Sequence, residues 1–174
     1  EIVRALSSTL GVVEKRQALP ILSNILLVVE ENSISITATD LESEVQTRCS
    51  PTSVESTGST TAPAKKLNEL CRLLPDGSQI IIFLNGDKLC IESGSGKYSI
   101  STLPSEDFPA FDATNEKTEF TILGSVLRNL ISKTSFAMGN QDWRHYLNGM
   151  YLNIEDKNIT AVTTDAHRLA ISTN

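Results

Sequence analysis

The chain is poor in aromatic residues and in cysteine, and it has no long apolar run. Aromatic residues make up 5% of its 174 residues. No apolar stretch approaches the roughly 20 residues that a membrane-spanning helix needs, and the first residues show no signal-peptide pattern. The sequence therefore predicts a soluble protein, cytoplasmic by default, with no membrane partner.

The few cysteines argue against a metal site. Cys49, Cys71 and Cys90 lie far apart, with no CxxC pair and no Cys/His cluster. A structural zinc site needs a compact set of Cys, His or acidic ligands. We therefore expect neither a metal nor a cofactor, and we interpret the three cysteines as buried free thiols.

An excess of positive charge is also missing. The chain has 15 Lys and Arg against 21 Asp and Glu, a net charge of -6. This balance argues against a protein that binds nucleic acid by overall charge alone. It is compatible with a basic face on an acidic body, because the distribution of charge sets the local potential.

The chain does contain an internal repeat, at an offset of 125 residues. Leu22 aligns with Leu147, the pair 39–40 aligns with 164–165, and no gap is needed over residues 2–49. A gap-free match that also preserves the apolar positions indicates a duplicated domain.

Each copy has a helix followed by strands. In copy one we expect a helix with its apolar stripe at Ile2, Leu6, Leu10 and Val13, strands at 25–30 and 33–39, a second helix after Pro63, and strands at 79–84, 89–92 and 97–102. In copy two we expect a strand at 119–123, a helix with its stripe at Leu127, Ile131, Ser135 and Met138, and strands at 150–155 and 158–163. The unit is an α+β domain of the order β-α-β-β-β-α-β-β-β, about 120 residues long.

The repeat predicts two domains. Residues 1–117 would be a first domain without its first strand, and residues 118–174 would be the first part of a second, truncated domain. The partner of the 119–123 strand would fall before residue 1, so we interpret the chain as an excerpt. The Pro-containing stretch 104–117 is the expected connector.

Several segments carry a family resemblance through their joint order and spacing. They are ALPILSN at 18–24, TDLE at 39–42, APAKK at 62–66, STLP at 101–104, DFP at 107–109, YLNG at 146–149 and TDAHRLA at 164–170. Together, over essentially the whole chain, they resemble the β sliding clamp of bacterial DNA polymerase III. The resemblance implies the DNA-clamp fold, with three such domains per chain (the third absent here) and two chains per ring, helices lining the DNA channel and sheets outside.

The resemblance also implies a function. The protein would be a non-catalytic processivity factor that encircles double-stranded DNA without sequence specificity. It would tether the DNA polymerase III alpha subunit, the clamp loader and other proteins with a clamp-binding motif, and it would act as a homodimer. The implied DNA contacts are Arg16, Lys65, Gln141, His145 and Tyr146. Phosphate contacts carry no sequence information, which suits a protein that slides.

The resemblance further implies a hydrophobic groove for partner peptides, formed by Leu147, Thr164, His167, Arg168 and Leu169. An apolar pocket with a few oriented polar groups suits Leu or Phe anchors. The alternative is that Leu147 and Leu169 are core residues and His167 is an ordinary surface histidine. Ala166 stands where glycine is expected.

Ring closure is the last implied contact. Lys66, Leu70, Tyr98 and Ile100 would meet the third domain of the other subunit, partly through an exposed edge strand at 97–100. The alternative is that Tyr98 and Ile100, which share a strand face, point into the core.

Catalysis is not expected. Asp40, Asp165 and His167 complete no metal or catalytic signature. The two aspartates are repeat equivalents at strand ends, so we interpret both as turn-capping residues. The glycine-containing segment 93–96 is expected to be a turn, because no GK[ST] motif or helix follows it. A protein-binding scaffold that does not encircle DNA stays open as the alternative function.

Overall fold

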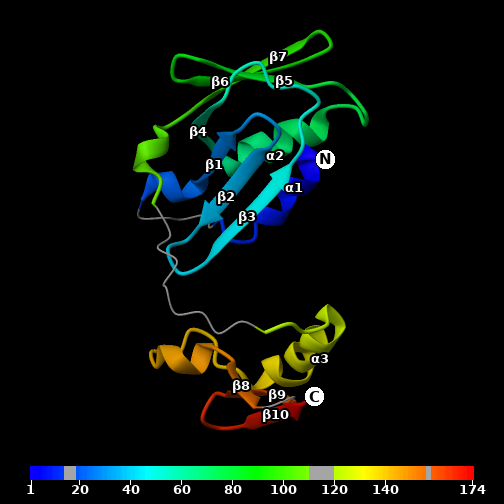
Figure 1. Cartoon of the computed structure of the whole chain (residues 1–174). Coiled ribbons are helices and arrows are strands. Elements are labelled where there is room, and N and C mark those ends of the chain that lie inside the picture. The colour runs from blue at the N-terminus through cyan, green and yellow to red at the C-terminus, as the bar shows by residue number, and fades with distance from the viewer. Residues whose placement is uncertain (14–18, 110–119, 156–157) are drawn as a thin grey trace. The chain divides into compact units, whose positions relative to one another are not determined.

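The computed structural model describes residues 1–13, 19–109, 120–155 and 158–174. The chain divides into two compact units, Glu1–Ala113 (unit 1) and Thr114–Asn174 (unit 2), which are coloured from blue to green and from yellow to red in Figure 1. In the described part of the chain, no helix is long and apolar enough to cross a membrane.

In the part of unit 1 that the structure describes, two short α-helices combine with two antiparallel sheets. The helices are α1 (Ile2–Thr9) and α2 (Ala64–Leu73). The first sheet has the order β3-β2-β1-β4, from β1 (Asn24–Val29), β2 (Ile34–Thr39), β3 (Glu44–Cys49) and β4 (Gly58–Pro63). The second sheet has the order β5-β6-β7, from β5 (Ile81–Asn85), β6 (Lys88–Ser93) and β7 (Gly96–Ser101).

One apolar core holds unit 1 together. Leu6 of α1 and Leu67 of α2 are fully buried, together with Ile36 of the first sheet and Ile91 of the second. The two helices contact each other and the first sheet, and they lie beside it in Figure 1. Each helix can do so because its apolar residues recur every three or four positions, on one side.

The two helices are also joined by a polar contact. Ser7 Oγ donates a hydrogen bond of 3.1 Å to Asn68 Oδ1, and Asn68 is buried. A buried amide needs such a partner to offset the loss of its hydration. The contact fixes α1 beside α2 and so sets which residues of both helices face solvent.

The described residues of unit 2 form one α-helix on one sheet. Its elements are α3 (Gly124–Thr134), the 3-10 turns η3 (Ser135–Ala137) and η4 (His145–Asn148), and strands β8 (Tyr151–Glu155), β9 (Asn158–Thr164) and β10 (Leu169–Thr173), in the sheet order β10-β9-β8. Leu130 of α3 packs with Ile159 and Ala161 of the central strand.

Strand register confirms the internal repeat. In unit 1, Leu27 pairs with Ile36. In unit 2, Leu152 pairs with Ala161, and both residues lie 125 positions further along the chain. The same offset separates η1 (Pro20–Ser23) from η4. Matching register over matching spacing shows that the two copies fold in the same way.

Unit 1 has a strand, β4, that the sequence patterns did not predict. Residues 58–63 are mostly Gly, Ser and Thr, and they lack the apolar alternation that predicts a strand. They form one because β4 pairs with β1 along its whole length, and Ala62 is buried in the core. Among the described residues, four strands therefore separate α1 from α2, where the expected order has three and ranges were predicted for two.

Two expectations for copy two are wrong. Of the predicted strand 119–123, residue 119 lies outside the described residues, and residues 120–123 form no strand and pair with no described strand. The buried face of α3 carries Leu130 and Thr134, whereas Ile131 is exposed. The repeat equivalent of Ile131 is Leu6, which is buried in a core shared with α2, and the described part of unit 2 has no counterpart of α2.

The ends of the two predicted helical stripes lie outside the helices. Leu10 and Val13 follow α1, and Ser135 and Met138 follow α3. Val13 is nevertheless buried in the core of unit 1. The turn that follows the helix therefore continues the apolar contact that helical periodicity predicted.

The predicted connector begins inside unit 1. Phe108 is buried, and η2 (Ser105–Asp107) contacts β4. The N–H of Thr61 donates to the carbonyl of Leu103 at 3.3 Å. The segment that follows β7 thus packs on the first sheet before the chain passes to unit 2.

The cysteines follow the prediction only in part. Cys71 is buried in the core of unit 1, and burial raises the pKa of its thiol. Cys49 and Cys90 are only half-buried. Cys49 lies in the edge strand β3, and Cys90 lies on the opposite face of β6 from the buried Leu89 and Ile91. Apolar composition alone does not reveal these positions.

Candidate functional site

The β2–β3 turn of unit 1 is a closed network of hydrogen bonds. Thr39 Oγ1 accepts from the N–H of Leu41 at 3.0 Å and donates to the carbonyl of Ser43 at 2.8 Å. Asp40 Oδ1 accepts from the N–H groups of Glu42 and Ser43. The Asp40 carboxylate therefore caps the turn, as predicted.

The β9–β10 turn of unit 2 repeats this network. Thr164 Oγ1 accepts from the N–H of Ala166 at 3.0 Å and donates to the carbonyl of Arg168 at 2.7 Å. Asp165 Oδ1 accepts from the N–H groups of His167 and Arg168, each at 2.9 Å. These backbone hydrogen bonds lower the pKa of Asp165. The capping role predicted for this aspartate is confirmed too.

The second turn has one feature that the first lacks. Arg168 Nε donates to Asp165 Oδ2 at 2.9 Å, whereas Ser43 stands at the equivalent position of the first turn. The bond directs the guanidinium along the turn and leaves His167 exposed at its tip. Unit 2 therefore presents basic side chains, His167 and an Arg168 that is paired with Asp165, at this turn (the cationic turn), where unit 1 presents Glu42.

A second loop of unit 2, residues 139–148, is braced from within. Asn148 Oδ1 accepts from the N–H of Asp142, and Asn148 Nδ2 donates to the Asp142 carbonyl, both at 2.9 Å. Arg144 donates to both carboxylate oxygens of Asp142, from Nε at 3.1 Å and from Nη2 at 2.9 Å. A bidentate pair of this kind fixes both side chains in one geometry.

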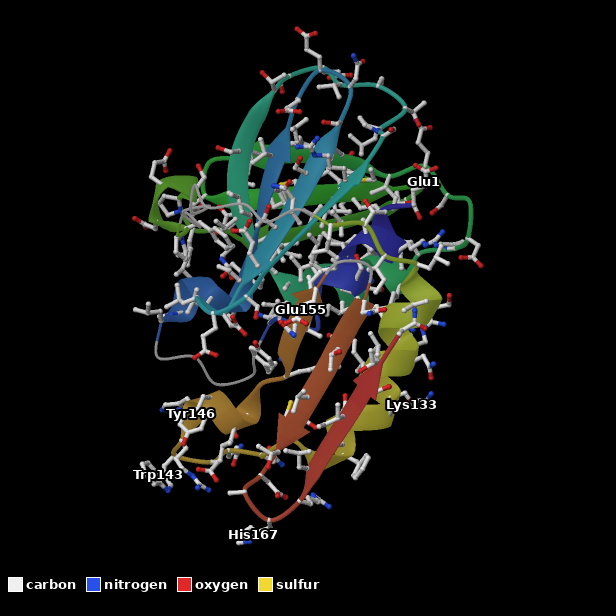
Figure 2. All side chains as sticks on the ribbon, turned by 60° about the horizontal axis from the view of Figure 1, so that its bottom comes forward. Glu1, Lys133, Trp143, Tyr146, Glu155 and His167 are labelled. Carbon is white, nitrogen blue, oxygen red and sulfur yellow. The ribbon has the colours of Figure 1, made fainter. Side chains whose placement is uncertain are left out.

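The loop and the cationic turn lie at the same end of unit 2. The pKa of Asp142 is lowered to about 2, first by the side-chain hydrogen bonds from Arg144 and then by the backbone hydrogen bond from the same residue. Figure 2 shows the labelled side chains of Trp143, Tyr146 and His167 at this end, with Lys133 of α3 at the opposite margin of the unit in this view.

The residues expected to contact DNA are divided between the units. Lys65 lies in the first turn of α2, half-buried. Gln141, His145 and Tyr146 are exposed on the braced loop of unit 2, where Gln141 has a left-handed backbone with φ of 56°. Arg16 lies outside the described residues.

The residues expected to form the peptide groove differ in burial, and Thr164 and Leu169 pair across β9 and β10. Leu147 is buried, and Thr164 is half-buried with its hydroxyl used by the turn. His167, Arg168 and Leu169 are exposed. Leu147 thus fits the alternative of a core residue, whereas Leu169 lies on the exposed side of the edge strand β10.

The residues expected at the ring interface separate by burial. β7 is an edge strand of its sheet, as predicted. Ile100 pairs with Leu89 in the core and is 8% exposed, whereas Tyr98 on the same strand is 42% exposed. On α2, Lys66 is exposed and Leu70 is half-buried. Burial favours the core interpretation for Ile100 and leaves Tyr98 open.

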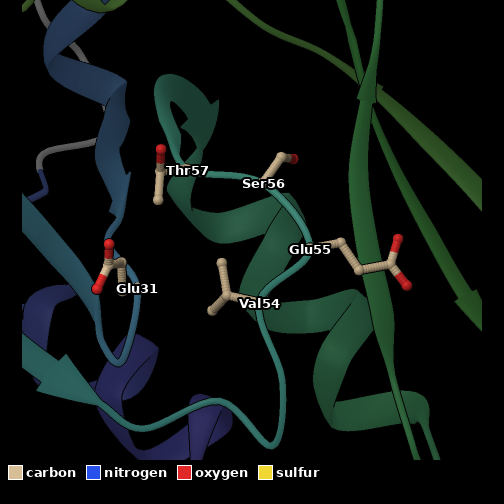
Figure 3. A pocket seen from close by; sticks show the side chains of 5 residues that line it. All are labelled: Glu31, Val54, Glu55, Ser56 and Thr57. Carbon is tan, nitrogen blue, oxygen red and sulfur yellow. The ribbon is translucent and has the colours of Figure 1, made fainter.

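A hollow elsewhere in unit 1 lies apart from these residues. Glu31, from the β1–β2 turn, and the segment 54–57, from the β3–β4 connection, line it (Figure 3). Its two carboxylates, from Glu31 and Glu55, would repel a phosphate. Among the residues that the structure describes, no group of three or more His, Cys, Asp or Glu is arranged to hold a metal ion.

Solved structures with the same fold define the class of the protein. The DNA polymerase III subunit beta of Pseudomonas aeruginosa superposes with a TM-score of 0.95 at 42% identity, over 99% of this chain and 47% of that one. The pol III beta of Caulobacter crescentus gives 0.94 at 35% identity, over 99% and 48%. A further P. aeruginosa sliding clamp, solved bound to griselimycin, gives 0.94 at 43% identity, over 99% and 47%. The fold is therefore that of a bacterial DNA sliding clamp, as expected.

Sequence comparison gives the family. The beta sliding clamp of Proteus mirabilis is 43% identical over 171 residues, 98% of this chain and 47% of that protein, and the one of Escherichia coli K12 is 40% identical over 170 residues. The family described as DNA polymerase III beta subunit, N-terminal domain, matches residues 1–112, and its central domain matches 121–174. The chain belongs to the DNA polymerase III beta subunit family. It spans about half the length of the curated relatives that it matches.

Proposed function

We propose that the complete protein is a DNA polymerase processivity factor that forms a homodimeric ring around duplex DNA. It catalyses no reaction, acts in the cytoplasm without sequence specificity, and tethers the DNA polymerase III alpha subunit, the clamp loader and other proteins with a clamp-binding motif. One observation carries the proposal: two copies of one fold, in the same strand register, match the first and second domains of the clamp family in order.

The proposed division of the chain is a first domain at 1–117 and the start of a second at 118–174. The boundary between the compact units, after Ala113, falls within the predicted connector. Tandem copies with a common fold suit a ring, because the same surface of each copy can face the same central cavity.

The proposed DNA contacts are Arg16, Lys65, Gln141, His145 and Tyr146. In unit 1, α1 and α2 lie side by side, with exposed Arg4 on one and Lys65 on the other. In unit 2, three of the five residues share one braced loop. Cations on helices of an acidic chain would attract phosphates to one face while the remaining surface repels them.

The proposed groove for partner peptides uses Leu147, Thr164, His167, Arg168 and Leu169. Its support is local: Thr164 pairs with Leu169 across the β9–β10 turn, and the Thr164 hydroxyl donates to the carbonyl of Arg168 in that turn. A related clamp was solved with bound griselimycin, which supports a ligand site in this family. The proposed ring contacts are Lys66, Leu70, Tyr98 and Ile100. Of the two residues on strand β7, Tyr98 is more accessible than Ile100.

Topology of DNA binding tests the proposal. The complete protein is loaded onto nicked circular DNA and onto the same DNA made linear, and retention is measured by gel filtration. We expect retention on circles and loss from linear ends, because a ring leaves DNA only by sliding off. Equal loss from both would overturn encirclement and favour the alternative, a protein-binding scaffold.

Charge-removing variants address the contacts within the same assay. Replacing Lys65 and Arg16 together with alanine should lower retention at moderate salt by several-fold, because each phosphate contact releases counterions. Replacing Arg48 and Lys88 together with alanine serves as the matched control, since both are exposed cations on strands of unit 1 and lie outside the proposed DNA and ring contacts. If the control variant loses retention to the same extent, Lys65 and Arg16 are not specific DNA contacts.

A further inference from the structure

The exposure of Trp143 is the observation that the proposed function leaves unexplained. It is the only tryptophan of the chain, and it is 82% exposed. Large aromatic side chains are normally buried or used at interfaces, since they offer much apolar surface with few rotatable bonds. Trp143 therefore has the character of an interface anchor.

The loop holds this side chain in a defined position. Trp143 lies between Asp142 and Arg144, whose side chains form the bidentate pair, and Asn148 braces the same stretch of backbone. The Arg144 guanidinium carbon lies 5.7 Å from the centroid of the Trp143 ring. One part of the ring is thus covered by Arg144, and the rest is open to solvent.

The neighbouring side chains indicate what the open ring can bind. Tyr146 is 77% exposed, and it extends from the same loop in Figure 2. Asp142 neutralises Arg144, so the pair adds little net charge that would attract a phosphate. What the loop offers is aromatic surface, which binds planar groups by stacking.

We propose that Trp143 is a stacking site for an unpaired DNA base, with Tyr146 beside it. Inside duplex DNA both faces of every base are covered by neighbouring bases and only the two terminal pairs have a free face, whereas every base of a single strand can present one. Stacking on an aromatic side chain is tolerant of base identity, since every base has such a face. The site would hold the single-stranded part of a duplex with a single-stranded extension. This inference rests on the proposed function, because it assumes that the loop faces DNA.

The single tryptophan provides its own assay. A thymidine oligonucleotide is titrated into the 174-residue chain at low ionic strength while tryptophan fluorescence is recorded, and a blunt duplex of the same length is titrated in parallel. We expect the single strand to quench the emission and the duplex to quench it much less. No quenching by the single strand, or equal quenching by both, would overturn the proposal.

Variants are compared by the anisotropy of a labelled oligonucleotide. Trp143→Ala should weaken single-strand binding by roughly 5-fold or more, the usual loss for one stacked base, whereas Trp143→Phe should retain most of it. Phe136→Ala is the matched control, because Phe136 is also an exposed aromatic residue of unit 2. Unchanged binding by Trp143→Ala would overturn the proposal. So would a result in which a Leu- and Phe-containing peptide quenches the tryptophan emission and the oligonucleotide does not.

Different results would reject the stacking role of Trp143 and the proposed encirclement of DNA. The complete protein carrying Trp143→Ala should still be retained on circular DNA, since encirclement does not depend on one stacking contact. Retention on circles together with unchanged single-strand affinity would reject the role of Trp143 alone. Loss of the unaltered protein from circles would reject the proposed function itself.

Discussion

Ala166 adopts a left-handed backbone conformation, with φ of 73°, and its repeat equivalent Leu41 has φ of 75°. Each follows a Thr-Asp pair whose side chains close the turn by hydrogen bonds. A residue with a Cβ in this conformation costs roughly 1–2 kcal/mol relative to the right-handed region. Glycine avoids that cost, which gives a physical reason to expect glycine at position 166.

Ala166→Gly should therefore stabilise unit 2 by about 0.5–1 kcal/mol, after the extra entropy of glycine in the unfolded chain is subtracted. The measurement is urea unfolding followed through NMR signals of unit 2. Ala170→Gly is the control, because Ala170 lies in the extended strand β10, where glycine should destabilise. A loss of stability in Ala166→Gly would contradict the strain argument.

Asp142 predicts a dependence of stability on pH. Hydrogen bonds from Arg144 lower its pKa from the ordinary 3.8 to about 2 in the folded state. A group with a lowered folded pKa adds stability that is fully present above the unfolded pKa and is lost as pH falls through the folded value. The braced loop should therefore weaken between about pH 4 and pH 2.

The measurement is the carbon-13 shift of the Asp142 carboxyl group during an acid titration, together with amide exchange of the loop at pH 5 and pH 2.5. Asp142→Asn should show little further change in loop exchange over this interval. Asp76→Asn is a suitable control because Asp76 is exposed in the turn that follows α2. An Asp142 titration near pH 4 would contradict the role of the Arg144 pair.

At the residue scale, some of the site was predictable and some was not. The capping roles of Asp40 and Asp165 followed from their equivalence in the repeat, because a backbone turn is a local structure. The exposure of Trp143 and the burial of Leu147 depend on how a loop packs on unit 2. The residue types alone do not determine that packing, although a single tryptophan in a polar loop was a usable signal.

At the scale of secondary-structure elements, β7 is the strand whose residues are hardest to assign to the core or to the surface from the sequence. Its residues Tyr98 and Ile100 point to one side of the sheet, yet Ile100 is buried and Tyr98 is much more exposed. The register explains part of this, because Ile100 lies opposite Leu89, near the middle of the core. One strand therefore has a buried position at Ile100 and an accessible position at Tyr98.

Ile100→Ala should destabilise unit 1 by about 2–4 kcal/mol, since truncation of a buried Ile removes apolar contact and leaves a cavity. Tyr98→Ala should change its stability by less than about 1 kcal/mol, while weakening dimers of the complete protein. Chemical unfolding of the 174-residue chain gives the first quantity, and analytical ultracentrifugation of the complete protein gives the second. Equal destabilisation by both variants would assign Tyr98 to the core as well.

Apolar patterns predicted most of the strands and missed β4, and they gave no range for β3 and β10, although burial alternates along both. The strands near β1, β2, β8 and β9 were predicted to within a residue or two. β4 was missed because its Ser and Thr residues contribute backbone pairing more than apolar surface. The stripe of α3 was displaced because the helix meets fewer partners than α1, so that Ile131 stays exposed although Leu6 is buried.

At the scale of the whole molecule, the two units differ in their cores. The core of unit 1 combines residues of both sheets and both helices. The described core of unit 2 consists of Leu130, Ile159 and Ala161, with a few half-buried neighbours. Because stability grows with the apolar area removed from water, unit 2 should be the less stable unit.

The repeat predicted this arrangement in outline. An offset of 125 residues requires two similar folds in sequence, and matching register in both bears that out. The difference in core size follows from which elements each unit contains, and composition does not report that. The same fold can therefore have two different stabilities within one chain.

Heating or urea should unfold the chain in two steps, with hydrogen exchange resolved by peptide showing loss of protection in 120–174 before 1–109. Leu130→Ala should lower the stability of unit 2 by about 2–5 kcal/mol and leave the later step unchanged, and Leu67→Ala should lower the stability of unit 1 by a similar amount. Both residues are fully buried leucines in helices, so the two variants are matched controls for each other. If either variant shifts both steps equally, the units unfold as one cooperative body. In that case the clamp repeats would depend on each other for stability, and each core could not be treated as a separate module.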